Sequence, residues 1–127
     1  GTALGDLGRY DEAIDSFEKA LSIAPNYALA WYNKGIAFER LGRHDEAIDS
    51  FEKTLSIAPN YTLAWYNKGL VLEKLGRYDE AIDSFDKALS IDPNYALAWY
   101  NKGIVLGKLG RHAEAFKCFD RALSDRH

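Results

Sequence analysis

A seven-residue phrase, Leu-Ala-Trp-Tyr-Asn-Lys-Gly, occurs three times in the chain, at residues 29–35, 63–69 and 97–103. Its recurrence gives a period of 34 residues, and residues 28–61 and 62–95 are identical at 25 of 34 positions. A fixed period of this length indicates stacked units of secondary structure, none of which can bury its apolar face alone. We therefore expect one repeat array over residues 1–127, with a partial copy at 1–27, full copies at 28–61 and 62–95, and a copy at 96–127 that is truncated at its end.

Each copy is predicted to form two helices, which we call helix A and helix B. Pro25 disfavours helix at the residue before it and so ends the preceding helix B, and Asn26 is a suitable N-cap for the helix A that follows. Helix A of the first full copy should run to about Leu41, because Gly42 stands where helices often end in a left-handed residue. The same helix ending is expected at three equivalent glycines, Gly8, Gly76 and Gly110. Two acidic residues, at 45 and 46, then open helix B, where they complement the helix dipole.

Helices A and B differ in how their apolar residues are distributed around the helix axis. Helix B of the first full copy has one broad apolar stripe, formed by Ala47, Ile48, Phe51, Leu55 and Ala58, as expected of a surface helix with one buried side. Helix A has a core face and, on roughly the opposite side, a narrow second stripe flanked by polar residues. With its flanks, the second stripe comprises Leu29, Tyr32, Asn33, Ile36 and Arg40, then Leu63, Tyr66, Asn67, Leu70 and Lys74, then Leu97, Tyr100, Asn101, Ile104 and Lys108.

The second stripe has two interpretations. Contiguous exposed apolar surface often marks a binding site, and tyrosines there supply stacking area together with a hydroxyl group. Alternatively, the stripe packs against helix A of the next copy. Different atoms of one tyrosine can serve both purposes.

The pattern Trp…Gly…Ala-x3-Phe…Pro at this period resembles the tetratricopeptide repeat family. In the first full copy its residues are Trp31, Gly35, Ala47, Phe51 and Pro59, and the resemblance covers essentially the whole chain. It implies an all-α fold, a right-handed superhelical solenoid of antiparallel helix pairs, with helix A lining the concave side. It also implies a non-catalytic adaptor or scaffold that binds a peptide or protein segment in that concave groove, which the second stripe would line.

The chain departs from the family pattern in two respects that bear on function. Lys34, Lys68 and Lys102 stand where the family usually has leucine, and we expect their stems to pack while their ammonium groups reach solvent. One family subgroup grips the C-terminal carboxylate of chaperone peptides with a clamp of lysines, arginine and asparagines. Here leucine or tyrosine replaces the clamp lysines, which argues against that ligand, whereas the asparagines remain available for an extended peptide backbone or an acidic side chain.

Residues capable of catalysis or metal binding show no converging pattern. His44 and His112 alternate with tyrosine at one packing position, and Cys118 replaces a serine of the other copies. An Asp-Glu pair opens helix B in three copies, and compensation of the helix dipole explains it. We therefore expect no enzyme activity, no cofactor and no metal site. The net charge of −3 and the sequence pI of about 5.6 give no electrostatic reason for binding nucleic acid or an anionic membrane.

The remaining expectations concern the cellular setting and the two ends. A single cysteine and the lack of a long apolar run predict a cytoplasmic protein, and the absence of methionine predicts a segment of a longer one. Without polar caps both ends should expose core-type surface. The alternative function is therefore a structural array that self-associates head to tail, with Phe119, Ala122 and Leu123 at one end. The near-identity of the copies is also compatible with a designed, consensus-like scaffold without a specific ligand.

Overall fold

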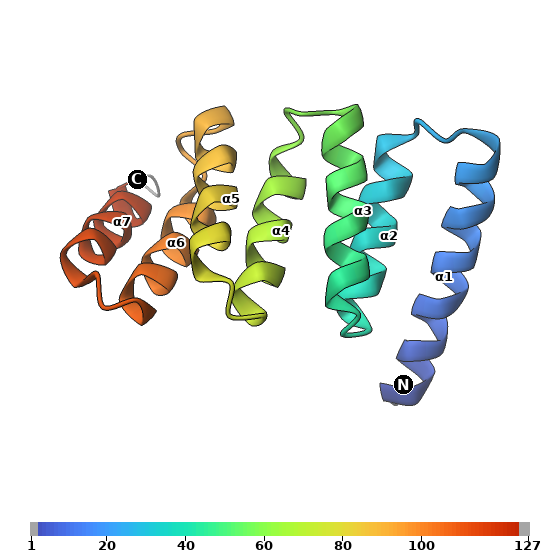
Figure 1. Ribbon diagram of the computed structural model, residues 1–127, viewed down its shortest axis with the longest axis horizontal. Coiled ribbons are helices and arrows are strands. Elements are labelled where there is room, and N and C mark those ends of the chain that lie inside the picture. Colours follow the sequence, from blue (N-terminus) through green and yellow to red (C-terminus); the bar gives the residue numbers. More distant parts are fainter. Residues whose placement is uncertain (1–2, 125–127) are drawn as a thin grey trace. The chain divides into compact units, whose positions relative to one another are not determined.

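The computed structural model describes residues 3–124, with side chains from Gly8 onward, and this part of the chain is entirely helical apart from short turns (Figure 1). The all-α prediction is confirmed. The helices are α1 (Ala3–Ile23), α2 (Ala28–Arg40), α3 (His44–Ile57), α4 (Thr62–Lys74), α5 (Tyr78–Ile91), α6 (Ala96–Lys108) and α7 (His112–Ser124).

The chain divides into two compact units, Gly1–Ala64 and Trp65–His127, with the division inside α4. In the first unit α1 packs on α2 and α2 packs on α3. In the second, α5 packs on α6 and α6 packs on α7. Helices α2, α4 and α6 are the predicted helices A of their copies, and α3, α5 and α7 are the helices B.

Three of the four predicted glycine endings are present. Gly42, Gly76 and Gly110 have φ angles of 76°, 76° and 79°, in the left-handed region that favours glycine. At the first of them the N–H of Gly42 donates to the carbonyl of Glu39 at 3.0 Å, and the next N–H, that of Arg43, reaches back to the carbonyl of Phe38 at 2.9 Å. These bonds satisfy the last carbonyls of α2 and reverse the chain into α3.

The fourth predicted ending, at Gly8, was wrong, because α1 runs without a break from Ala3 to Ile23. Gly8 is exposed, and nothing lies within 4 Å of the position that its Cβ would take. Glycine permits a left-handed turn but does not impose one, so the helix continues where no neighbouring segment requires a reversal.

The N-cap prediction for Asn26 was also wrong. The N-cap of α2 is Tyr27, whose side chain makes no capping hydrogen bond. Its backbone takes that role, because the carbonyl of Tyr27 accepts from the N–H groups of Ala30 and Trp31. Asn26 instead lies inside a turn closed by the bond from the Tyr27 N–H to the carbonyl of Ala24, at 3.2 Å.

A tryptophan fastens the turns at Pro25 and Pro93 to the helix that follows each of them. The indole Nε1 of Trp31 donates to the carbonyl of Pro25 at 2.8 Å, and Trp99 makes the same bond to Pro93 at the same distance. A buried or half-buried indole needs an acceptor for its single N–H, and the proline carbonyl supplies it.

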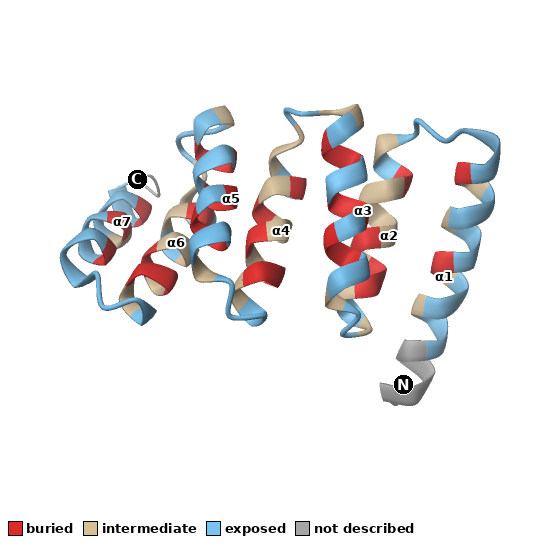
Figure 2. Cartoon of the chain, in the orientation of Figure 1, coloured by how far each residue is buried: buried red, intermediate tan, exposed pale blue. Residues whose placement is uncertain are grey.

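The core of each copy is a contact between a glycine of helix A and a phenylalanine of helix B. A Cβ on Gly69 would lie 2.6 Å from Cε1 of Phe85, and the Gly35–Phe51 and Gly103–Phe119 pairs have the same separation. Phe51 and Phe85 are fully buried, and the buried residues follow the facing sides of the helices (Figure 2). Only glycine lets the two backbones approach this closely over a phenyl ring.

Candidate functional site

The residues of the second stripe fall into three environments. Leu29, Arg40, Leu63, Lys74, Leu97, Tyr100 and Lys108 are exposed. Tyr32, Asn33, Ile36, Asn67, Leu70, Asn101 and Ile104 are half-buried. Tyr66 is buried, with only 9% of its surface accessible. The stripe therefore presents leucines at its surface, with amides and larger apolar side chains set deeper.

Tyr66 is enclosed within the second unit by residues of its own and the following copy. Its ring makes an edge-on contact with Tyr95, with centroids 5.1 Å apart, and a tilted contact with Phe85 at 5.9 Å. Its hydroxyl oxygen accepts a hydrogen bond of 2.8 Å from Nδ2 of Asn101. Burial raises the pKa of the Tyr66 hydroxyl to about 12, so the phenol stays neutral throughout the physiological range.

The Asn101 amide is held in a fixed orientation. Its Nδ2 donates both to the Tyr66 hydroxyl on α4 and to the backbone carbonyl of Leu97, each at 2.8 Å. An amide NH2 group has two hydrogens, so these bonds use both. What Asn101 offers to a ligand is its carbonyl oxygen, an acceptor suited to a backbone N–H.

In the first unit, too, the ring of a stripe tyrosine packs against a tyrosine later in the same copy. Tyr32 on α2 makes a tilted ring contact with Tyr61, in the turn before α4, with ring centroids 4.9 Å apart, and another with Phe51 at 5.8 Å. In both units the tyrosine of the second stripe is thus partly covered by the tyrosine that ends its own copy. These ring contacts lie within one copy, whereas the bond from Asn101 to the Tyr66 hydroxyl is a contact with helix A of the next copy, the kind that the packing interpretation describes.

Lys108, one of the cations on the flank of the stripe, is paired in the second unit. Nζ of Lys108 lies 3.0 Å from Oε2 of Glu73 on α4 and 5.7 Å from the centroid of the Tyr78 ring. The hydrogen bond to Glu73 raises the pKa of the lysine. Lys108 thereby makes a contact between copies, and its charge is offset by that of Glu73.

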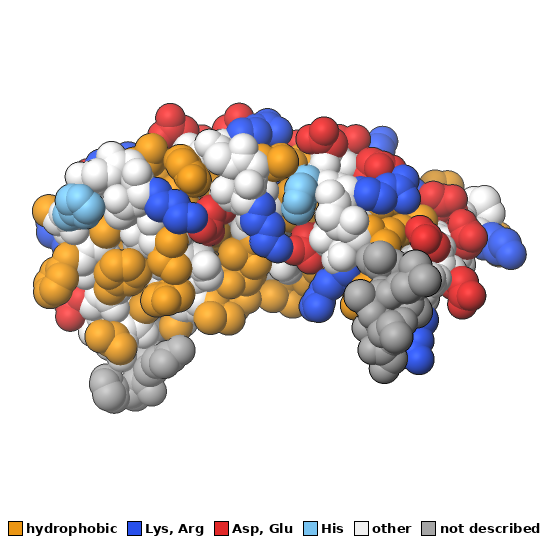
Figure 3. Space-filling model, turned by 90° about the horizontal axis from the view of Figure 1, so that it is seen from below, with side chains coloured by type: hydrophobic (Ala, Val, Ile, Leu, Met, Phe, Trp, Pro, Cys, Tyr) orange, Lys and Arg blue, Asp and Glu red, His pale blue; other side chains and the backbone are white. Residues whose placement is uncertain are grey.

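An open apolar pocket, which we call the end pocket, lies between α6 and α7. It has a volume of about 360 Å³ and is lined by Ala96, Leu97, Tyr100, Phe119, Ala122 and Leu123. Hydrophobic side chains gather over these C-terminal helices, at the left of Figure 3. Sequence reasoning placed Phe119, Ala122 and Leu123 at an exposed end and placed Leu97 and Tyr100 in the stripe, but it did not bring the two groups together.

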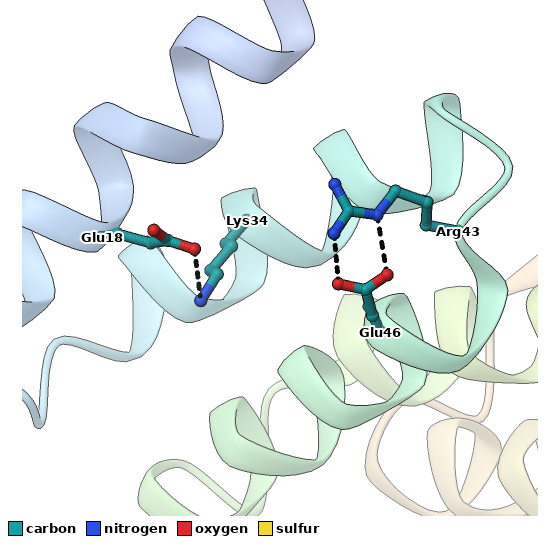
Figure 4. Close-up of polar contacts among 4 residues, drawn as sticks. All are labelled: Glu18, Lys34, Arg43 and Glu46. Carbon is teal, nitrogen blue, oxygen red and sulfur yellow. Dashed lines mark hydrogen bonds and ion pairs between the residues drawn. The ribbon is translucent and has the colours of Figure 1, made fainter.

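The opposite side of helix A carries the lysines that depart from the family pattern. Lys34 of α2 reaches Glu18 of α1 at 3.4 Å (Figure 4), and Lys102 of α6 reaches Asp86 of α5 at 2.7 Å. Each ammonium also lies over the tryptophan of its own helix, at 5.0 Å and 5.5 Å from the ring centroid. The side chains are only 14% and 20% exposed, so the stems pack as predicted, and the ammonium groups pair with acidic side chains of the neighbouring helix.

A glutamate in the first turn of helix B forms a local ion pair with the arginine three residues before it. Arg43 holds Glu46 with two bonds, from Nε to Oε1 at 2.7 Å and from Nη2 to Oε2 at 2.5 Å (Figure 4). This hydrogen bonding lowers the pKa of Glu46. The same arrangement recurs between Arg77 and Glu80. Each pair braces the first turn of its helix.

The nucleophilic and metal-binding candidates give no site in the described residues. Cys118 is buried, and burial raises the pKa of its thiol, the opposite of what activates a cysteine. Within residues 3–124 no three His, Cys, Asp or Glu side chains come together as a metal site would require. No helix in that part of the chain combines the length and the apolar character needed to cross a membrane.

Comparison with known families and structures agrees with this geometry. Models described as tetratricopeptide repeat match residues 1–62, 62–95 and 96–124. A search of curated protein sequences gives no match.

Several solved structures are similar to the chain. A crystal structure of MamA is 30% identical with a TM-score of 0.91, covering 95% of this chain and 71% of the other. A second MamA crystal structure is 31% identical with a TM-score of 0.88, covering 94% and 66%. MamA 41-end from Desulfovibrio magneticus RS-1 is 25% identical with a TM-score of 0.86, covering 97% and 70%. These likenesses extend the helical-repeat fold over nearly all of the chain.

Proposed function

Because the chain belongs to the tetratricopeptide repeat family, we propose that its role as a protein-interaction scaffold is exercised through the second stripe, which binds an extended peptide or protein segment without catalysis. The observation that carries this proposal is the fixed amide of Asn101. Its carbonyl oxygen is oriented by the bonds to Tyr66 and Leu97, and it lies on the same helix face as Leu97 and Ile104.

The chemistry of the stripe favours one class of segment. A preorganised acceptor recognises a backbone N–H at low entropic cost, and neighbouring leucine and isoleucine side chains offer apolar contacts on either side. Since Lys108 is already paired with Glu73, an acidic side chain gains little there. The preferred ligand is therefore an extended segment with spaced apolar residues and no requirement for negative charge.

The test is selection from a peptide library displayed against the 127-residue protein. Ile104→Glu places a charge on the stripe without touching the end pocket, and we expect it to abolish recovery of the selected peptides. Phe116→Glu makes the same kind of change at an exposed apolar residue of α7 outside the stripe, so it should leave recovery intact. Peptides retained equally by both variants would overturn the assignment of the stripe.

Self-association is the second candidate function, and the end pocket favours it. Leu123 is 61% exposed beside the open apolar pocket, and exposed apolar surface of this kind often marks a contact with another protein chain. Light scattering over a range of concentrations should then show a mass that rises with concentration in the wild type and rises less in Leu123→Lys. A constant monomer mass in the wild type would reject this candidate.

A further inference from the structure

Three copies of the repeat have an open pocket on the side of helix A that faces away from the second stripe. In the last copy this pocket has a volume of about 330 Å³ and is formed by residues of α6 and α7. We call it the basic groove, and its lining consists of Trp99, Lys102, Leu106, Glu114, Lys117, Cys118 and Arg121. It shares no residue with the second stripe or with the end pocket.

The repeat itself builds this pocket. The same seven positions line pockets of about 250 Å³ and 230 Å³ in the two preceding copies, which further helices follow along the chain. In one of them the seven are Trp31, Lys34, Phe38, Glu46, Asp49, Ser50 and Lys53, joined by Glu18 of α1; in the other they are Trp65, Lys68, Leu72, Glu80, Asp83, Ser84 and Lys87. A feature found only in the basic groove is therefore a property of the sequence of that copy.

One lining position reverses the sign of its charge in the basic groove. Lys117 stands where the two preceding copies have Asp49 and Asp83, and all three side chains are exposed. The other charged positions of the lining keep their sign, since Lys102, Glu114 and Arg121 correspond to lysine, glutamate and lysine in both counterparts. The basic groove is thus the one of the three whose lining has an excess of positive charge.

The two cations of α7 are spaced to hold two carboxylates. Lys117 and Arg121 are four residues apart on one helix, so they lie on the same face with a rise of about 6 Å between them. The guanidinium of Arg121 lies over the Trp99 ring, 5.4 Å from its centroid, which keeps it at the groove. Side chains two residues apart in an extended chain point the same way and are about 6.5–7 Å apart. The cations therefore match an extended segment with two acids separated by one residue.

The acids nearest to these cations have partners of their own. Glu114, the acid of the lining, accepts two hydrogen bonds from Arg111, at 3.1 Å and 2.6 Å. Asp86 of α5 pairs with Nζ of Lys102 at 2.7 Å. The positive charge that position 117 adds is therefore not matched by an additional acid in the lining.

We propose that the basic groove binds an acidic segment of a partner protein, in which two carboxylates are separated by one residue of extended chain. One carboxylate pairs with Lys117 and the other with Arg121, while the segment passes over the Trp99 ring. The aspartates at positions 49 and 83 repel the same segment from the two counterpart grooves. This site goes beyond the function proposed above, because it lies on the other side of helix A from the second stripe.

The experiment follows the indole N–H signals of the isotope-labelled 127-residue protein by NMR, because each tryptophan lines one of the three grooves. The probe is the peptide Ser-Asp-Val-Asp-Ser, with blocked ends that remove the terminal charges and a valine that favours an extended chain. We expect the Trp99 signal to shift saturably while those of Trp31 and Trp65 stay in place. A peptide with asparagine in place of both aspartates should cause no shift.

Reciprocal substitutions provide matched variants. Lys117→Asp gives the groove the lining charge of its counterparts and should weaken binding at least about threefold, because an exposed ion pair is replaced by repulsion. Asp83→Lys makes the reverse change one copy earlier and should add a saturable shift of the Trp65 signal. Both positions are exposed, and each substitution introduces the residue of another copy. The same spectra establish that both variants are folded.

Several results would overturn the proposal. These are the absence of a saturable Trp99 shift, equal shifts of all three indole signals, the same response to the asparagine peptide, or unchanged affinity in Lys117→Asp. An equal Trp99 shift with sodium phosphate would assign the groove to small anions instead. Self-association that is lost in Lys117→Asp would assign it to a second copy. Ile104→Glu should leave the Trp99 shift intact, so failure of the proposal for the stripe is distinguishable from failure of this one.

Discussion

Gly69 has no side chain, and the Phe85 ring occupies the space where one would be. An added Cβ would come within 2.6 Å of Cε1 and 2.8 Å of Cδ1 of a ring that is fully buried and cannot move aside. We expect Gly69→Ala to lower the free energy of unfolding by about 1–3 kcal/mol, the usual penalty for overpacking.

The control for this change lies in α6. Gly107 has nothing within 4 Å of its Cβ position, so Gly107→Ala should raise the free energy of unfolding by about 0.5–1 kcal/mol through the higher helix propensity of alanine. Urea denaturation measures both. Effects of the same sign would show that the ring does not limit the approach of helices A and B.

The hydroxyl of Tyr66 should make stability depend on pH in the alkaline range. Its pKa is about 12 in the folded protein and near the ordinary 10.0 when the chain unfolds. Below pH 10 the phenol is neutral in both states and contributes no pH dependence. Between pH 10 and 12 the unfolded state loses the proton first, so the free energy of unfolding falls as the pH rises.

Tyr66→Phe tests this dependence. At neutral pH the variant should be less stable by about 0.5–1.5 kcal/mol, because the bond from Asn101 is lost. Between pH 10 and 12 the deficit should shrink, since phenylalanine does not ionise. Denaturant unfolding at neutral pH and across that interval measures it, and parallel pH curves for the two proteins would contradict the assignment.

At the scale of the secondary-structure element, two glycines with the same sequence context behave differently. Gly8 is inside the unbroken helix α1, whereas Gly76 ends α4 with a φ of 76°. We expect Gly8→Ala to raise helicity and stabilise the protein by about 0.5–1 kcal/mol. Gly76→Ala should destabilise it by about 1 kcal/mol or more, since alanine is strained in the left-handed region. Far-ultraviolet circular dichroism with thermal unfolding checks both predictions. Destabilisation by Gly8→Ala would indicate that a helix ends at that position after all.

The sequence predicts the ends of these helices correctly where the residue at the end itself determines the backbone conformation. The glycine endings at 42, 76 and 110 and the proline-marked turns follow from backbone conformations that few other residues adopt. The predictions at Gly8 and Asn26 were wrong because each residue permits the predicted conformation without requiring it.

The candidate site was predictable in its residues but not in its bonds. Periodicity on one helix identified the face that contains Tyr66 and Asn101, yet it could not show that the two bond to each other across copies. A spacing of 35 residues, one period plus one, was the available signal. The end pocket escaped prediction because its lining joins the second stripe of helix A to the core stripe of helix B.

For the whole molecule, stability should vary along the chain. In repeat proteins each unit is held mainly by its immediate neighbours. Among the described side chains of α1 only Ile14 and Leu21 are buried, whereas α5 buries Ala81, Ile82, Ser84, Phe85, Ala88 and Leu89. We expect amide hydrogens of α1 and α7 to exchange faster than those of α5. Hydrogen exchange followed by mass spectrometry measures this, and uniform protection over all helices would indicate a single cooperative unit instead.

The tryptophan bonds to Pro25 and Pro93 bear on how the chain is degraded. A protease must draw several consecutive residues into an extended form, and polar surface loops are usually where it succeeds. Here the indole ties the carbonyl of the proline to the first turn of the next helix, so the connection becomes extended only when that hydrogen bond breaks. The joints between copies therefore resist cutting, and digestion should begin where a helix can fray.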